Sequence, residues 1–213
     1  YYREEKTLDE EHAVEDLQRI LSSGRHLLQL INDVLDLAKI ESGNMTVFNE
    51  TFESVTIIEE LLTTMAPIAK KSGNLIVLEK SNDIPKLYND AVKFRQLLLN
   101  LLSNACKFTQ NGKITILASY NEKNNHAVFH VSDTGIGMTA SQIDRVFKAC
   151  VQADSSTSKK YGGTGLGLAI CKQFVELMQG SMDVTSAEGK GTTFTVLLPA
   201  KAVIQAPKDA IPS

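Results

Sequence analysis

The sequence predicts an α+β protein in which one long N-terminal helix precedes a compact domain of strands and helices. Two observations predict this class. An apolar repeat with coiled-coil spacing runs through the first part of the chain, and segments with strand or helix periodicity alternate over the remainder. The 213 residues are enough for one ordinary domain with a helical appendage.

A long helix is expected over residues 8–41, because apolar side chains recur there at alternating spacings of four and three. The members of this repeat are Leu17, Leu21, Gly24, Leu28, Ile31, Leu35 and Ala38. Ile20, Leu27 and Val34 form a second stripe beside it, which gives the wide apolar face of a bundle of several helices. One helix cannot bury that face alone, so a partner helix is implied, either upstream or on another chain. Gly43 is the expected helix stop.

The elements of the compact domain follow from periodicity and turn residues. Strands are expected at residues 45–48, 75–79, 113–120, 127–132, 181–186 and 192–198, and helices at residues 54–71, 89–108, 139–147 and 165–178. The strands at 113–120 and 127–132 alternate like antiparallel neighbours. Residues 148–164 are polar and rich in Ser, Thr, Lys and Gly, which predicts a mobile loop, and residues 201–213 resemble a linker.

Composition argues against several classes of protein. The chain is 43% hydrophobic and 22% charged, as in ordinary soluble domains. No apolar run is long enough to span a membrane and the polar N-terminus is no signal peptide, so a cytoplasmic location is expected, with any membrane anchor elsewhere in the parent protein. A net charge of -3 offers no footprint for nucleic acid. The three cysteines form no CxxC pair, which indicates reduced thiols rather than a zinc site.

The first motif that carries chemistry is a polar stripe on the expected helix 89–108. Asn100, Asn104 and Lys107 are spaced by four and three residues and therefore share one face of an otherwise apolar helix. Amide oxygens are hard metal ligands and an ammonium attracts phosphate, so the set suits a magnesium–triphosphate. The alternative is a solvated stripe on an amphipathic helix.

The second motif is Asp133-Thr134-Gly135-Ile136-Gly137, directly after an expected strand. A buried carboxylate at a strand end can accept a hydrogen bond from an exocyclic amine. The two glycines permit a tight turn and close approach of the backbone to a planar ligand. The alternative is an ordinary Asp/Gly turn.

The third motif is the glycine-rich stretch 162–168, which leads into a helix. Free backbone N–H groups and the helix dipole at such a start favour phosphate, although the stretch is neither a Walker A loop nor a Rossmann fingerprint. A flexible hinge is the alternative. Lys159 and Lys160 just before it either approach phosphates or are solvated. A weaker signal is Thr192 at the start of the last strand, where threonine is also a common strand former.

Taken together and in this order, these motifs resemble the ATP-binding domain of histidine kinases, a branch of the Bergerat-fold ATPases. The N box of that family is similar to residues 100–109, its first glycine box to 133–137 and its second to 163–168. The stretch LLQLINDVLDLAKIESG resembles the second helix of the family's dimerisation hairpin. The resemblance implies a two-layer α/β sandwich with a mixed sheet of about five strands and three main helices. It also implies a division into hairpin helix (1–42), ATP-binding catalytic domain (43–200) and linker (201–213).

The resemblance further implies a set of ligands for ATP and Mg²⁺. Asn104 would hold Mg²⁺, Asn100 would assist at the metal or the phosphates, and Lys107 would contact the phosphates. Asp133 would recognise the adenine amine, with Thr192 supporting it. Gly135 and Gly137 would let the chain close over the base, and residues 148–164 would form a lid. The other implied ATP contacts are Lys160 and the backbone donors of Gly163, Gly165, Leu166 and Gly167, which would bind the phosphates.

Two departures from the family pattern stand out. The phosphoacceptor motif, a histidine followed by Glu, an aliphatic residue, Arg, Thr and Pro, is absent, so no phosphoacceptor is expected in this chain and the first hairpin helix is expected to be missing. His26, in the second-helix stretch, is expected in or beside the bundle interface instead. The phenylalanine box retains Phe147, but Cys150 stands where a second aromatic residue is usual.

The implied activity is transfer of the γ-phosphoryl group of ATP to a histidine on the absent helix, for relay to a response-regulator aspartate. The implied partners are a second copy, through the N-terminal helical bundle, and a receiver domain. One alternative is a non-catalytic nucleotide-binding dimerisation module, which the missing histidine and altered phenylalanine box favour. Another is a Bergerat-fold ATPase, but that activity uses a glutamate where Asn100 stands, and asparagine is a poor base.

Overall fold

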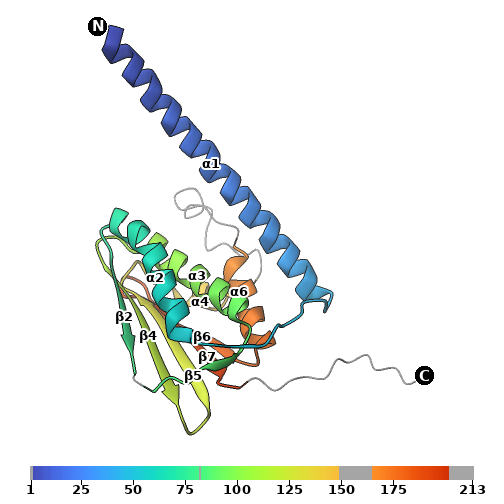
Figure 1. The fold of residues 1–213 in the computed structure, drawn as a ribbon. Helices are drawn as coiled ribbons and strands as arrows, with labels where there is room; N and C mark the ends of the chain where they lie inside the picture. The colour runs from blue at the N-terminus through green and yellow to red at the C-terminus, as the bar shows by residue number, and fades with distance from the viewer. Residues whose placement is uncertain (1, 82, 149–164, 202–213) are drawn as a thin grey trace, which may run out of the picture. The chain divides into compact units, whose positions relative to one another are not determined.

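The computed structural model describes residues 2–81, 83–148 and 165–201, and the chain divides into two compact units, Tyr1–Met45 and Thr46–Ser213 (Figure 1). The first unit is helix α1 (Tyr2–Glu41), which begins before the predicted residue 8. It ends as predicted. Gly43 has φ +69°, and the Asn44 and Gly43 N–H groups donate to the Lys39 and Ile40 carbonyls at 2.9 and 3.0 Å, which is a Schellman cap.

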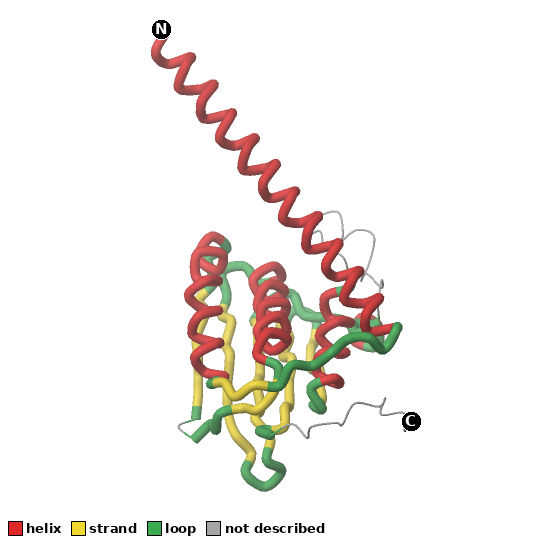
Figure 2. Tube along the Cα trace, turned by 45° about the vertical axis from the view of Figure 1, so that its right-hand side comes forward, coloured by secondary structure: helices red, strands yellow, loops and turns green. Residues whose placement is uncertain are grey.

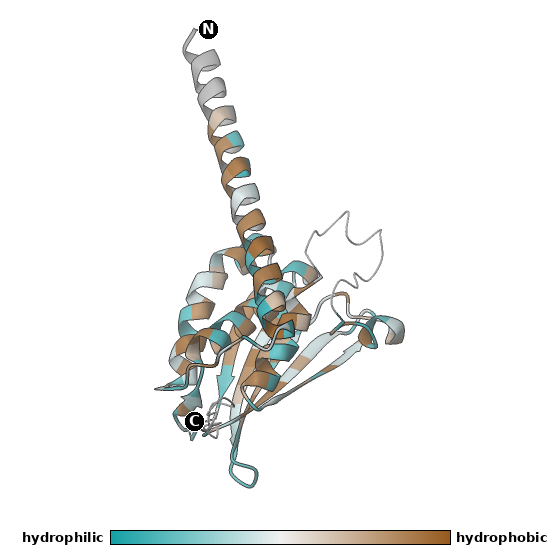
Figure 3. Ribbon diagram, turned by 90° about the vertical axis from the view of Figure 1, so that its right-hand side faces the viewer, coloured by the Kyte–Doolittle hydropathy of each residue, from teal (hydrophilic) through white to brown (hydrophobic). Residues whose placement is uncertain are grey.

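An apolar face of α1 is open to solvent in the single chain. Its large apolar side chains are between 48% and 68% exposed: Val14, Leu17, Ile20, Leu21, Leu27, Leu28, Ile31, Val34 and Leu35. Figure 3 shows these apolar stretches of α1 in brown. Contiguous apolar surface on a soluble protein marks an interaction site, because covering it removes the cost of hydrating it.

The second unit is built on a mixed five-stranded sheet, as predicted. Its strands are β2 (Leu75–Lys80), β4 (Lys113–Asn121), β5 (His126–Asp133), β7 (Gly191–Pro199) and β6 (Ser181–Ala187), in that spatial order. Strands β2 and β4 are parallel and all other neighbours are antiparallel. The predicted antiparallel pairing of the third and fourth expected strands is therefore confirmed.

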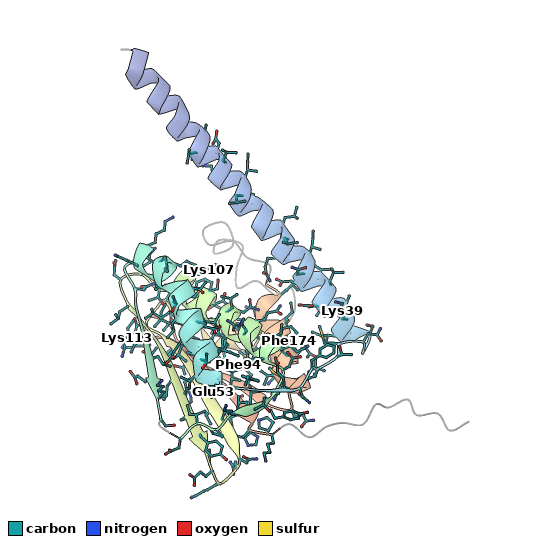
Figure 4. The ribbon with its side chains drawn as sticks, in the orientation of Figure 1. Lys39, Glu53, Phe94, Lys107, Lys113 and Phe174 are labelled. Atoms are coloured by element: carbon teal, nitrogen blue, oxygen red, sulfur yellow. The ribbon has the colours of Figure 1, made fainter. Side chains whose placement is uncertain are left out.

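Three main helices cover one face of this sheet: α2 (Ser54–Lys71), α3 (Ala91–Phe108) and α6 (Gly167–Leu177), with α3 between the other two (Figures 1 and 2). The predicted two-layer sandwich is confirmed. The core lies between the layers, where the rings of Phe94 on α3 and Phe129 on β5 are 5.0 Å apart. Phe174 of α6 is buried in the same layer (Figure 4).

A second, two-stranded sheet was not predicted. It pairs β1 (Glu50–Phe52) with β3 (Leu87–Asn89). The predicted strand at residues 45–48 is wrong, because its backbone bonds to side chains and not to another strand. The Phe48 N–H donates to the Asp90 carboxylate at 3.0 Å, and the Thr46 carbonyl accepts from the Lys93 ammonium at 2.7 Å.

The boundaries of three helices also differ from the prediction. Helix α3 begins at Ala91 and not at residue 89, because Asp90 caps it by accepting from the Lys93 N–H at 2.9 Å. Helix α6 begins at Gly167 and not at residue 165, since Gly165 has φ +70°. Helix α4 (Ala140–Ile143) is shorter than the predicted 139–147. The backbone bonds that follow it join residues three apart, as in turns.

The predicted loop at 148–164 and the tail at 201–213 lie outside the described residues, except for Lys148 and Lys201. Within the described ranges, none of the helices is both long and apolar enough to cross a membrane. Cys106 and Cys171 are buried and are not joined in a disulfide, and Cys150 lies outside the described residues.

Candidate functional site

The polar stripe on α3 forms as predicted. Asn100, Asn104 and Lys107 are half-buried on this central helix, whereas Leu97 and Leu101 point into the core and are fully buried. Burial lowers the pKa of Lys107 below its usual 10.5, because an ammonium in a partly dry environment has lost hydration. Lys107 lies toward the C-terminal end of α3 (Figure 4), with its Nζ 4.9 Å from the ring centre of Phe108.

Asn100 faces the start of helix α6. Its Nδ2 lies 3.6 Å from Sγ of Cys171, and a Cβ added to Gly167 would be 3.8 Å from the same nitrogen. No side chain caps α6, whose N-cap residue is Leu166. The first-turn N–H groups of this helix therefore lie near the amide of Asn100, and they are the kind of donors that bind phosphate.

Of the residues predicted to bind the phosphates through the glycine-rich stretch, the structure describes Gly165, Leu166 and Gly167 at the start of α6. Lys160 and Gly163 lie outside the described residues. Leu166 is buried, and Gly167 lies where the start of α6 approaches Asn100 of α3. The start of α6 therefore lies at ordinary contact distance from the Asn100 side chain.

Asp133 ends strand β5 and is held by its neighbours. Its Oδ1 accepts hydrogen bonds from the Gly135 N–H at 2.8 Å and from the Thr109 hydroxyl at 3.4 Å. Burial raises the pKa of Asp133 above its usual 3.8, and bonds from Gly135, Thr109 and the Thr192 backbone only partly offset this. A hydrogen-bond donor on a ligand would therefore stabilise the charged form of the Asp133 carboxylate further.

The glycines of this turn are required by the protein's own backbone. A Cβ on Gly135 would collide with the Phe108 carbonyl, and one on Gly137, which has φ +66°, would collide with the Ala187 carbonyl. The Ile136 N–H donates to the Phe108 carbonyl at 3.2 Å and the Ile136 carbonyl accepts from Gly189 at 2.7 Å. The turn is therefore clamped between the end of α3 and the β6–β7 turn. The approach of these glycines to a ligand stays a prediction.

Thr192 lies directly opposite Asp133 in the β5–β7 ladder, and Ser186 lies opposite Thr192 in the β7–β6 ladder. The Ser186 and Thr192 hydroxyls are 3.0 Å apart. Asp133 and Thr192 are both residues that the sequence predicts at the adenine site, and they are neighbours in the sheet. Ser186 and Thr109, for which the sequence predicts no role, bond to Thr192 and Asp133, respectively. Strand alternation places Ser186 on the same face of the sheet as Met182, but only the register of the β6–β7 pair shows that Thr192 lies opposite it.

Phe147, the retained member of the predicted phenylalanine box, packs on the same end of the sheet. Its ring lies 6.3 Å from that of Phe194 on β7 in an edge-on arrangement, and the Lys172 ammonium of α6 is 5.6 Å from its centre. Both contacts attach the segment before residue 149 to the sheet and to α6.

The donor set fits a magnesium–nucleotide better than a metal held by protein alone. Among the described residues, no group of three or more His, Cys, Asp or Glu side chains could hold a metal ion. Asn100 and Asn104 are half-buried and offer two amide oxygens, which are too few to fill the six positions of an octahedral site. Mg²⁺ is usually bound in this way, with one or two protein ligands and the remaining positions filled by substrate phosphates and water.

Comparison with known protein families matches two parts of the chain. Residues 89–202, more than half of the sequence, match the family described as histidine kinase-, DNA gyrase B-, and HSP90-like ATPase. Residues 3–43 match the His Kinase A (phospho-acceptor) domain.

Several individual proteins are similar to the chain. The autoinducer 2 sensor kinase/phosphatase LuxQ of Vibrio harveyi is 36% identical over 200 residues, which span 92% of this chain and 23% of LuxQ. The circadian input-output histidine kinase CikA of Synechococcus elongatus is 39% identical over 197 residues, which span 92% and 26%. Full-length ShkA, solved in complex with AMPPNP, has a TM-score of 0.75 at 33% identity and covers 87% of this chain and 38% of ShkA. The chain thus spans about a quarter of the length of the curated relatives it matches.

Proposed function

The chain belongs to the family of histidine kinase-, DNA gyrase B- and HSP90-like ATPases, and on this premise we propose that it is the ATP-binding catalytic core of a sensor histidine kinase. The γ-phosphoryl group of ATP passes to a histidine imidazole on a dimerisation hairpin. The bond between the γ-phosphorus and the bridging oxygen of ADP breaks, a phosphorus–nitrogen bond forms, and ADP leaves. The reaction needs positioning and charge neutralisation more than it needs a nucleophile within this domain.

The chain's own residues supply that positioning. Asp133 accepts a hydrogen bond from the exocyclic amine of the base, while Lys107 and the N–H groups at the start of α6 offset the charge of the phosphates. Asn100 and Asn104 would hold Mg²⁺, which neutralises charge on the phosphate oxygens when it is bound. AMPPNP, the compound in the ShkA complex, is an analogue of ATP and supports this choice of nucleotide.

The observation that carries the proposal is the approach of Gly167 to Asn100. A Cβ added to Gly167 would lie 3.8 Å from the Asn100 amide, and this closeness supports a site in which an amide that would hold Mg²⁺ acts beside the donors of a helix start. A solvated polar stripe, the alternative reading of α3, gives no reason for a second helix to begin there. Asn100 also favours transfer over hydrolysis, because an asparagine cannot remove a proton from water.

Helix α1 is proposed to form the dimer. Its open apolar face and its match to the His Kinase A domain support association with a second copy through a helical bundle. A response-regulator receiver domain is the proposed acceptor of the phosphoryl group after the histidine. The sensor kinases among the similar proteins support this general class of partner.

The experiment that tests the proposal supplies an acceptor histidine on a separate hairpin. The full chain is mixed with Mg-ATP labelled at the γ-position and a separate helical hairpin that carries a histidine in the family's phosphoacceptor motif. We expect label on the hairpin that is labile to acid and stable to base, and no label on a hairpin with glutamine in place of that histidine. ATP binding without transfer would favour the non-catalytic module, and release of phosphate without transfer would favour the ATPase.

A further inference from the structure

Three residues form a row across the helix-covered face of the sheet, at the end where the candidate site lies. They are Asp133 on β5, Thr192 on β7 and Ser186 on β6, each directly opposite the next. Thr192 is 8% exposed, and Ser186 is half-buried beside it. Asp133 and Thr192 belong to the proposed adenine site, whereas Ser186 has no role in it so far.

Ser186 is the centre of three hydrogen bonds. Its Oγ lies 2.9 Å from the Met138 backbone nitrogen, 2.8 Å from the Gly191 carbonyl oxygen and 3.0 Å from the Thr192 hydroxyl. It therefore joins the turn after Asp133 to both strands of the β6–β7 hairpin.

The chemistry of these partners fixes the direction of every bond. The Met138 N–H can only donate and the Gly191 carbonyl can only accept, so the single Ser186 proton points to Gly191. The remaining bond then has one direction left: the Thr192 hydroxyl must donate its proton to Ser186. Thr192 has no second proton, and toward any ligand it presents only lone pairs.

The site consequently presents two acceptors side by side, the Asp133 carboxylate and the Thr192 hydroxyl oxygen. A purine with an amine at position 6 brings hydrogens to such a pair. A purine with a carbonyl at the same position brings lone pairs against lone pairs, so neither acceptor gains a bond from that atom and binding of this base is disfavoured.

We propose that Ser186 is a specificity-determining residue, which holds the Thr192 hydroxyl as an acceptor and thereby makes the site select a 6-amino purine over a 6-oxo purine. The inference rests on the proposed function, because it assumes that the base binds at Asp133. Ser186 acts through Thr192 and is a positioning residue that does not itself touch the nucleotide.

The test compares the affinities of the full chain for Mg-ATP and Mg-ITP, whose base has a carbonyl where ATP has the amine. We expect the native chain to prefer ATP, and Ser186→Ala to reduce the ratio of the two affinities about tenfold, the equivalent of one hydrogen bond, mainly by tighter binding of ITP. In that variant the Thr192 proton is free to turn toward the carbonyl. Ser186→Thr keeps the hydroxyl and should keep the native ratio.

A matched control lies on the opposite face of the same strands. The Thr193 hydroxyl donates to Ser132 at 2.9 Å, so Ser132→Ala removes a similar serine–threonine bond away from the site. Its ATP-to-ITP ratio should equal that of the native chain. If Ser186→Ala does not fold, Thr192→Val carries the test, since loss of the second acceptor should also lower the ratio.

The possible results separate the inference from the function on which it rests. An unchanged ratio in Ser186→Ala or in Thr192→Val, with ATP still bound, overturns the role of Ser186 and leaves the ATP site standing. Equal weakening of ATP and ITP shows that Ser186 supports the fold only, and also overturns the inference. A native chain that binds neither nucleotide overturns the proposed function and the inference together.

Discussion

Replacement of Asp90 by alanine should destabilise the second unit more than loss of any surface charge. The Asp90 side chain is 2% exposed and accepts from the Lys93 N–H, the Lys93 ammonium and the Phe48 N–H, each within 3.0 Å. Asp90→Ala removes the cap of α3, at about 1 kcal/mol. It also leaves the Lys93 ammonium, whose side chain is 10% exposed, without its carboxylate partner. Removing one partner of a buried pair costs about 3–5 kcal/mol, which we take as the total.

The assay is urea unfolding followed by circular dichroism, with a matched control on the surface. Glu60→Ala breaks the pair between Glu60 and Arg95, whose side chains are 55% and 44% exposed, and should cost no more than about 0.5 kcal/mol. The double variant Asp90→Asn with Lys93→Met carries no buried charge at either position. It should therefore recover much of the stability that Asp90→Ala loses. Unfolding of Asp90→Ala within about 0.5 kcal/mol of the native chain would refute the reasoning.

The same pair sets a dependence of stability on pH. Burial raises the pKa of Asp90, but the bonds from Lys93 and Phe48 and the charge of Lys93 outweigh it, so the pKa lies below the usual 3.8. An acid whose pKa is depressed by folding stabilises the protein fully above the unfolded pKa. That contribution is lost as the pH falls from about 4 through the folded pKa, and it should be missing from Asp90→Ala in acid titrations of unfolding.

Three further predictions concern the site. Gly137→Ala should lower the free energy of unfolding by more than the roughly 1 kcal/mol that a strained positive φ costs, because the added Cβ also collides with the Ala187 carbonyl. The control is Gly189→Ala, which has φ +71° but open space around the added Cβ and so measures the backbone strain alone. Thermal melts compare the two variants. Since burial raises the pKa of Asp133, ATP affinity should fall as the pH drops through a value above 3.8, and calorimetry of Asp133→Asn should show no such step. The Lys107 pKa is lowered, so ATP affinity should also fall on the alkaline side before 10.5 is reached, and a Lys107→Met variant that keeps this step would contradict the assignment.

The longer helices and strands could be predicted from the sequence, because a long element repeats its apolar pattern often enough to be recognised. Helices α2 and α3 each have enough turns for their apolar stripes to be read, and β4 and β5 alternate over eight or nine residues. Strands β1 and β3 have three residues each, too few for alternation to be recognised. Residues 45–48 alternate like a strand, but side chains of the α3 cap bond their backbone instead.

The site divides in the same way. Asn100, Asn104 and Lys107 share a face because the helical period places them there, and that period is local. The row of Asp133, Thr192 and Ser186 depends on β5 pairing with β7, although α4, α6 and β6 lie between them in the chain. Spacing along the sequence carries no information on that register, so the hydroxyl that orients Thr192 could be found only in three dimensions.

The most direct test of the nucleotide site is calorimetry of ATP binding to the full chain, with and without Mg²⁺. The account predicts binding that strengthens with Mg²⁺, loses this dependence in Asn104→Ala and is lost or strongly weakened in Asp133→Ala. Ser103→Ala, an exposed neighbour on α3, should behave like the native chain. Absence of binding at millimolar ATP, or binding that neither Mg²⁺ nor these two variants alters, would contradict the assignment of the site.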